Sequence, residues 1–147
     1  MANKKDSDRS VKQCPEGTIL FREGEAGDRM YVIKSGIVRL TKQVMDQRVT
    51  LEDLGAGEFC GGLALVNDQP RAATATVLED ASIIGIDAAQ FENMLRSNTE
   101  IALRMLKKIS QRLTHAHYRI SNLILRDNKA RLLHQLRQEV HAYTSAR

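Results

Sequence analysis

The sequence predicts an α+β protein in which an antiparallel β unit is followed by long helices. All nine glycines lie between Gly17 and Gly85, and both prolines, Pro15 and Pro70, precede the same point. Turn formers concentrated in this way favour short strands joined by tight turns. Residues 86–147 contain neither residue type, which favours long helices. The length of 147 residues is typical of a single globular unit with at most a short extension.

The composition excludes several classes of protein. A hydrophobic content of 42% and a charged content of 27% argue against disorder and against collagen-like repeats. No apolar run approaches the ~20 residues that a membrane span needs. Residues 1–12 are polar, so we expect no secretory signal and a cytoplasmic location. Cys14 and Cys60 are too few for a disulfide framework and lack metal-ligand spacing, so we expect free thiols.

The net charge of +4 conceals an uneven distribution. Residues 1–100 carry 12 bases and 16 acids, whereas residues 101–147 carry 10 bases, 2 acids and all four histidines. Such a basic segment can contact nucleic acid or an acidic lipid surface. A solvated basic helix face is the commoner meaning of this composition, and we favour it.

Runs of β-branched, aromatic and apolar residues predict at least six strands in the β unit. These runs cover residues 18–21, 30–34, 37–41, 48–52, 73–78 and 81–86. Ser35-Gly36 separates the second run from the third, which predicts a hairpin turn there. The number and spacing of the strands are typical of an antiparallel sandwich or barrel.

Two N-cap motifs mark the beginning of the helical part. Asp87 followed by Gln90 can cap one helix, and Ser97 with Glu100 can cap a second, much longer one. Asp127-Asn128 can interrupt that helix and cap another. Within the longer helix, apolar residues recur at alternating spacings of four and three, the pattern of a coiled-coil seam: Ala102, Leu106, Ile109, Leu113, Ala116, Ile120 and Leu123. We expect a parallel homodimer through this seam, the alternative being that it packs on its own β unit.

The most informative candidate site lies at residues 57–65 and 70–74. Gly61 and Gly62 let the backbone turn tightly and present amide groups to an anion. Arg71 supplies a planar fork of donors that suits phosphate oxygens. Together they predict a phosphate cradle, although glycine pairs and a Pro-Arg step also occur in ordinary turns.

Several segments of the chain resemble the signature of the cyclic nucleotide-binding domain. They are GEAGDRMYVI at residues 24–33, Gly36, GEFCGGLAL at 57–65 and PRAAT at 70–74. The family includes the catabolite activator proteins and the regulatory subunits of the cyclic AMP-dependent kinase, and the resemblance runs from about residue 17 to residue 127. It implies an eight-stranded jelly roll, a phosphate-binding cassette between two strands, and a long helix after the roll.

The resemblance also implies a ligand site. Arg71 corresponds to the cassette arginine that pairs with the exocyclic oxygens of the cyclic phosphate, and Ala72 to a residue that donates its backbone N–H there. The full set of expected ligand-binding residues is Gly61, Gly62, Leu63, Ala64, Arg71, Ala72, Ala73 and His117. The expected ligand is cyclic AMP rather than cyclic GMP. The expected function is that of a sensor domain of a bacterial activator-like transcription regulator or signalling protein.

Two places depart from the family pattern. Gly62 stands where the family has a glutamate that accepts the ribose 2′-hydroxyl, a bond worth about 1.5–3 kcal/mol, so affinity should fall roughly 10- to 150-fold. Ala116 and His117 replace two hydroxyl residues that cap the adenine in bacterial activators; His117 can stack on a base or be simply solvated. The alternative is therefore a ligand-free scaffold that docks an acidic partner through basic residues of the helix: Arg104, Lys107, Lys108, Arg112 and Arg119.

In the bacterial activators a helix-turn-helix DNA reader follows the long helix, and residues 128–140 resemble its first helix. Only seven residues follow Val140, so we expect no DNA reading without a further domain. No catalytic or metal-ligating constellation is found, so we expect a protein that is not an enzyme. The expected organisation is a polar tail at 1–13, the roll at 14–98, the heptad helix at 99–127, and a basic helix or truncated start of an output domain at 128–147.

Overall fold

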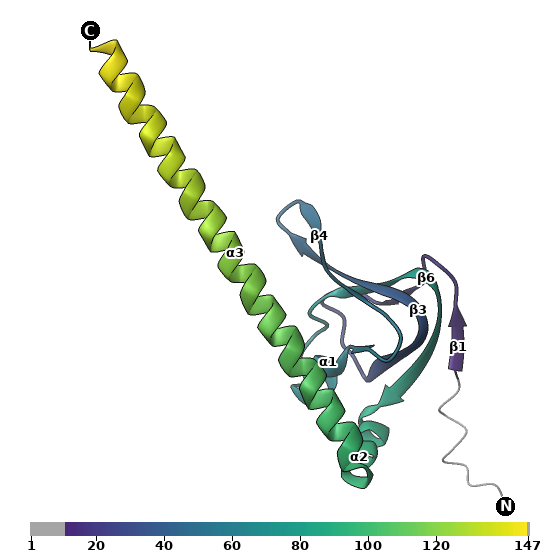
Figure 1. The fold of residues 1–147 in the computed structure, drawn as a ribbon. Helices are drawn as coiled ribbons and strands as arrows, with labels where there is room; N and C mark the ends of the chain where they lie inside the picture. Colours follow the sequence, from purple (N-terminus) through teal and green to yellow (C-terminus); the bar gives the residue numbers. More distant parts are fainter. Residues whose placement is uncertain (1–10, 147) are drawn as a thin grey trace, which may run out of the picture. The chain divides into compact units, whose positions relative to one another are not determined.

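The computed structural model describes residues 11–146, and the chain divides into two compact units, Met1–Thr99 and Glu100–Arg147. In its described part the first unit holds six strands and two short helices (Figure 1): β1 (Val11–Cys14), β2 (Ile19–Phe21), β3 (Arg29–Val44), β4 (Gln47–Leu54), β5 (Phe59–Cys60), α1 (Gly62–Val66), β6 (Thr74–Asp87) and α2 (Ala88–Ser97). The second unit is formed by α3 (Thr99–Ser145). The predicted antiparallel β roll followed by a long helix is confirmed.

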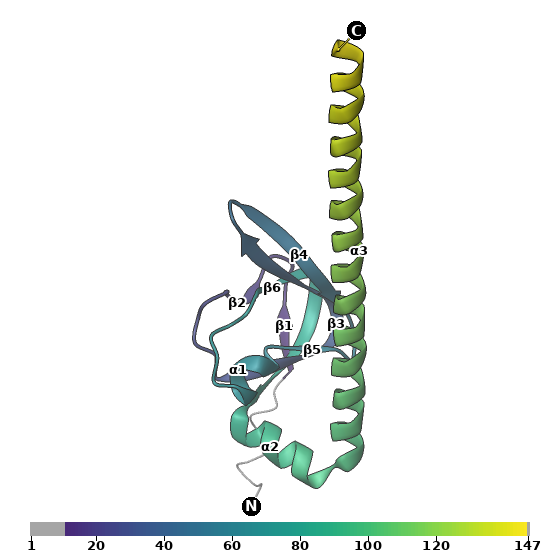
Figure 2. The same cartoon turned by 90° about the vertical axis from the view of Figure 1, so that its left-hand side faces the viewer.

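The strands form one antiparallel sheet whose central members are β3 and β6. Its order is β1-β6-β3-β4, with β2 added to β6 and β5 added to β3. β4 folds back on β3 as a hairpin that extends away from the other strands (Figure 2). The curled strands enclose one apolar core, whose largest fully buried side chains are Met30, Ile33, Leu54, Ile83, Val38 and Val77.

The hairpin that we predicted at Ser35-Gly36 is wrong. β3 runs through these residues without a turn, and both of its halves pair with β6, as Ile33 does with Ile83 and Val38 with Val77. The register shifts on either side of Ser35, which makes the segment an irregular bulge in a continuous strand. Runs expected as separate strands therefore merge, in β6 as well as in β3. This merging is one reason why the structure has six strands where the resemblance implied eight.

β1 begins within the segment that we assigned to a polar tail. Val11 pairs with Ile84 and Cys14 with Ala81, at the edge of the sheet. An edge strand needs few apolar residues because one side faces solvent, and three of its four residues are exposed. The rest of the predicted tail, residues 1–10, lies outside the described residues. Cys14 and Cys60 are free thiols, as expected, and Cys60 is buried.

The capping box of α2 is confirmed. Asp87 Oδ1 accepts the Gln90 N–H at 2.8 Å, and Gln90 Oε1 accepts the Asp87 N–H at 3.0 Å. Ser97, which we predicted as the cap of the next helix, instead ends α2. Its hydroxyl donates to the Asn93 carbonyl at 2.7 Å. One residue, Asn98, with an extended backbone, separates α2 from α3.

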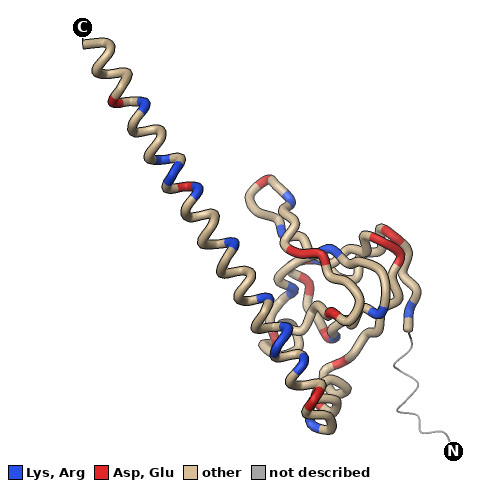
Figure 3. Tube along the Cα trace, in the orientation of Figure 1, with Lys and Arg blue, Asp and Glu red and all other residues tan. Residues whose placement is uncertain are grey.

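α3 is one helix of 47 residues, so its predicted interruption at Asp127-Asn128 is wrong. The Asp127 carboxylate forms an ion pair with Arg131 one turn later, with 3.0 Å between Oδ2 and Nη2. Ion pairs between residues four apart stabilise a helix, which accounts for the continuation of α3 through Asp127-Asn128. Lys and Arg recur along α3 with few acidic residues between them (Figure 3). None of the helices within residues 11–146 is both long and apolar enough to cross a lipid bilayer.

Replacing Gly36 by alanine should destabilise the roll more than the same change at Gly17. Both glycines have left-handed backbones, with φ of +85° and +87°, so each change costs about 1–2 kcal/mol in strain. A Cβ at Gly36 would also collide with the backbone of Asp80 and Ala81, whereas a Cβ at Gly17 meets nothing within 4 Å. In urea unfolding we expect G36A to lose roughly 2 kcal/mol more than G17A. Equal losses would contradict the close approach of Gly36 to the backbone of Asp80 and Ala81.

Candidate phosphate-binding site

Arg71 stands three residues before β6 and is held there by its own backbone. Its N–H donates to the Glu25 carbonyl and its carbonyl accepts the Gly24 N–H, both at 2.8 Å. Pro70, which precedes it, restricts the chain on the other side. The residue is only 5% exposed. The loop before β6 therefore directs a charged side chain into the roll.

The guanidinium of Arg71 is bound by main-chain oxygens. Nη1 donates to the Gly61 carbonyl at 3.0 Å and Nη2 donates to the Arg29 carbonyl at 2.7 Å. The group also stacks over the ring of Phe21, 4.2 Å from its centroid, with Tyr31 at 6.0 Å. Nε is buried and finds no hydrogen-bond partner among the residues that the structure describes. The buried Nε–H is thus available to an additional acceptor.

Arg29 and Arg71 meet although they belong to opposite ends of the β3–β6 ladder. Arg29 pairs with Asp87, while Thr41, twelve residues further along β3, pairs with Thr74, just after Arg71. In a flat sheet these ends would lie about 40 Å apart. The 2.7 Å bond from Arg71 Nη2 to the Arg29 carbonyl therefore requires the two strands to curl until the ends meet.

Two glycines make room for the guanidinium. A Cβ on Gly27 would collide with Nε and Cζ of Arg71, and a Cβ on Gly61 would approach Nη1. Gly61 also has a left-handed backbone, with φ of +83°, which favours glycine independently. The guanidinium of Arg71 therefore occupies a space that is open only because Gly27 and Gly61 have no Cβ.

The structure brings most of the expected ligand-binding residues around this cradle. Gly61 precedes α1, which contains Gly62, Leu63 and Ala64, and the buried Ala64 side chain faces the position that a Cβ of Gly27 would take. Ala72 is exposed and Ala73 is buried, both directly after Arg71. The exception is His117, which belongs to α3 in the second unit.

Sequence reasoning missed a charged network beside the cradle. Lys42 Nζ donates to Glu23 Oε1 at 2.8 Å and to the Ala72 carbonyl at 3.1 Å, and Glu23 Oε2 accepts the Gln43 N–H at 2.9 Å. The hydrogen bond from the Gln43 backbone, together with Lys42, holds the pKa of the Glu23 carboxyl below its ordinary value. In the sequence, Lys42 and Glu23 resemble ordinary charged surface residues. The two acceptors of Lys42 lie about 20 and 30 residues away along the chain, so no local pattern indicates these contacts.

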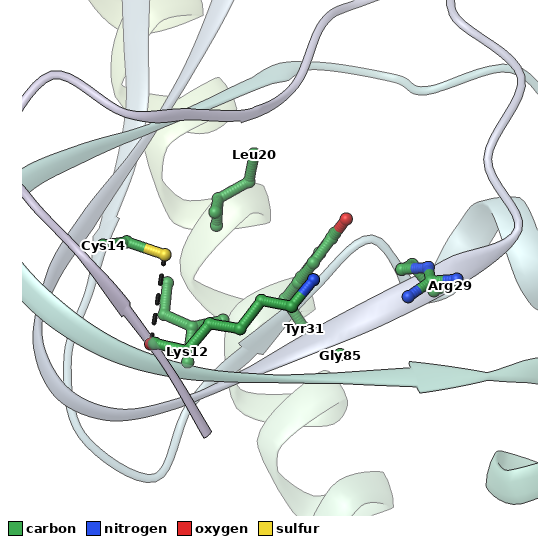
Figure 4. Close-up of a pocket in the computed structure, with 7 residues that line it drawn as sticks. Lys12, Cys14, Leu20, Arg29, Tyr31 and Gly85 are labelled. Atoms are coloured by element: carbon green, nitrogen blue, oxygen red, sulfur yellow. Dashed lines mark hydrogen bonds between the residues drawn. The ribbon is translucent and has the colours of Figure 1, made fainter. Parts of the chain in front are cut away.

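A separate cavity is lined in part by Tyr31 (Figure 4). Its volume is about 60 Å³, and Lys12, Cys14 and Arg29 are among the residues that line it. Small-molecule sites usually measure about 300–1,000 Å³, so this hollow is too small for a nucleotide. Burial raises the pKa of the Tyr31 hydroxyl above its ordinary value, against the opposite effect of Arg29.

A family model described as the cyclic nucleotide-binding domain matches residues 11–98, more than half of the chain. The chain belongs to the cyclic nucleotide-binding domain family. The match ends at Asn98, so α3 lies beyond the part that defines the family.

Relatives of this cyclic nucleotide-binding domain include longer proteins. The chain is 30% identical over 125 residues to the CRP-like cAMP-activated global transcriptional regulator of Mycobacterium tuberculosis, covering 84% of this chain and 56% of that protein. It is 36% identical over 98 residues to a cyclic nucleotide-gated potassium channel of Rhizobium etli, covering 67% and 26%. The catabolite activator protein of Thermus thermophilus has a similar structure, with a TM-score of 0.69 at 27% identity over 78% of this chain and 54% of that one. The chain thus spans about half the length of the mycobacterial regulator and a quarter of the channel.

Proposed function

We propose that this cyclic nucleotide-binding domain is a regulatory sensor that binds cyclic AMP through Arg71 and the main-chain amides around it. The observation that carries the proposal is the buried guanidinium with an unused Nε donor. The mycobacterial relative is named as cAMP-activated, which supports cyclic AMP as the ligand. We assign the domain to the cytoplasm and expect no catalysis by it, as the sequence predicts.

The electrostatics of the cradle favour an anion. A buried arginine is normally paired with a carboxylate, because an unpaired charge in a protein interior is costly. None of the ion pairs within residues 11–146 includes Arg71, whose bonded partners are neutral carbonyls. A phosphate oxygen at Nε would satisfy this unpartnered nitrogen and supply a bonded negative charge. We assign further phosphate contacts to the backbone of Gly61, Gly62, Leu63, Ala64, Ala72 and Ala73.

Base recognition is assigned to α3. His117 can donate from its ring or stack on a base, and stacking would favour the larger ring of a purine over a pyrimidine. Ala116 has no polar atom in its side chain and cannot contribute a hydrogen bond. We therefore expect weaker discrimination between cyclic AMP and cyclic GMP than two hydroxyl residues would provide.

A parallel homodimer through α3 is the second part of the proposal. The seam residues Leu106, Leu113 and Ile120 are each more than half exposed, so they present an apolar stripe to a partner helix. In this heptad register Arg112 and Arg119 stand at g positions, directly beside the seam. An antiparallel pair would place arginine beside arginine, whereas a parallel pair places each g residue beside an e residue of the other helix. The charges therefore favour the parallel arrangement.

A ligand-free interaction scaffold is the competing function. Gly62 and Ala116 favour it, since both remove a polar side chain that related proteins use for the ligand. It predicts no saturable binding of any cyclic nucleotide, together with an acidic partner for the basic helix. The two functions therefore differ in a measurement on the isolated chain.

Calorimetric titration with cyclic AMP tests the proposed function. We expect saturable binding that weakens at least about 100-fold in R71A, since one partner of a buried charged pair is removed. The exposed Arg48 on β4 provides the control, and R48A should bind like the parent. R71K retains the charge but not the planar fork, and should also lose affinity. A parent chain that binds neither cyclic AMP nor cyclic GMP at millimolar concentration would leave only the scaffold.

Replacing Gly62 by glutamate should strengthen cyclic AMP binding about tenfold or more, because it supplies an acceptor for the ribose 2′-hydroxyl. The position has room, since a Cβ there meets nothing within 4 Å, and its backbone is not left-handed. The control is 2′-deoxy cyclic AMP, whose affinity should not rise. An equal gain for both ligands would contradict this role of position 62.

A lysine in the seam should dissociate the dimer. Leu113 stands at a core position of the heptad, so L113K would bury two charges against each other. Leu125 is similarly apolar and 65% exposed but lies outside the seam, and L125K should leave the dimer intact. Sedimentation equilibrium distinguishes the two variants. A monomeric parent, or an L113K variant that stays dimeric, contradicts the proposed interface.

A further inference from the structure

Three segments that are distant in the sequence meet behind the phosphate cradle. They are the loop at residues 22–25, the end of β3 at 41–43, and the stretch at 71–74 that leads into β6. Glu23 contributes to two of their contacts: its backbone N–H donates to Thr74 Oγ1 at 3.0 Å, and its carboxylate accepts the Gln43 N–H at 2.9 Å. The loop is thus tied both to β3 and to the start of β6.

Lys42, at the end of β3, contacts both of the other segments. Its Nζ donates to the Glu23 carboxylate at 2.8 Å and to the Ala72 carbonyl at 3.1 Å. The carbonyl of Ala72 belongs to the peptide between Ala72 and Ala73, one residue after Arg71. The positions of Arg71 and of the Ala72 N–H therefore both depend on where this short stretch is held.

The network is well placed to position the site and poorly placed to stabilise the fold. The side chains of Lys42 and Glu23 are 44% and 28% exposed, and ion pairs open to solvent contribute little to folding stability. Lys42 nevertheless donates to a specific main-chain atom next to Arg71, the Ala72 carbonyl, and Glu23 is fixed by the main-chain N–H of Gln43. A shift of about 1 Å in a binding group is enough to weaken a charged contact substantially.

We propose that Lys42, held by Glu23, is a positioning residue of the ligand site, which fixes the Arg71–Ala72 segment without touching the ligand. The proposal rests on the function proposed above. It extends the site to the C-terminal end of β3, which the sequence did not connect with the phosphate cassette.

The test compares three variants with the parent chain. K42M removes the ammonium group but keeps most of the aliphatic stem, and K42R restores a cationic donor. K34M is the matched control, because Lys34 is an exposed lysine of the same strand. The readouts are cyclic AMP affinity by calorimetry, the NMR signal of the Arg71 Nε–H in the free protein, and the urea midpoint.

We expect K42M to weaken cyclic AMP binding about five- to tenfold and to shift the Arg71 Nε–H signal, with a urea midpoint like that of K34M. K42R should recover both the affinity and the signal. An unchanged Arg71 signal in K42M, or an unchanged affinity when the parent binds, overturns the proposal. If the parent binds no cyclic nucleotide while K42M still shifts the signal, the sensing function fails but Lys42 does position Arg71.

Discussion

The guanidinium of Arg71 is a buried positive charge whose hydrogen-bond partners are neutral carbonyls, and the arrangement of the roll follows from accommodating it. Two carbonyls and the face of Phe21 partly replace the water that the cation has lost. Gly27 and Gly61 leave room for it because neither has a side chain. These groups hold the guanidinium in place, yet its Nε finds no partner among the described residues and its charge has no bonded counterion. This incomplete compensation gives the site its affinity for an anion.

The curl of the sheet is what creates the site. β3 and β6 pair along most of their length, and only their strong curvature brings the start of β3 to the loop before β6. The irregular segment around Gly36 lies within this ladder and gives the continuous strand a place to bend. Lys42, near the far end of β3, reaches the Ala72 carbonyl through the ladder itself, because the adjacent residue Thr41 pairs with Thr74. A flat sheet with the same strand order would keep Arg71 next to Lys42 but far from the Arg29 carbonyl.

Local patterns in the sequence predicted local features correctly. Asp87 with Gln90 identified the start of α2, and the family resemblance directed attention to Arg71 and Gly61 before any geometry was known, whereas the role of Gly27 beside Arg71 was missed. Errors arose where long-range pairing decides the outcome: Ser35-Gly36 has the composition of a turn, but both flanking runs pair with β6. The contact between Lys42 and Ala72 joins residues 30 positions apart, and no spacing rule indicates it.

A crystal structure of the chain grown with cyclic AMP tests the central claim most directly. The account predicts phosphate density within hydrogen-bonding distance of Arg71 Nε, with the guanidinium still between Gly27 and Gly61. Cyclic AMP bound elsewhere would contradict it. A ligand-free structure in which a carboxylate forms an ion pair with the Arg71 guanidinium would also contradict it.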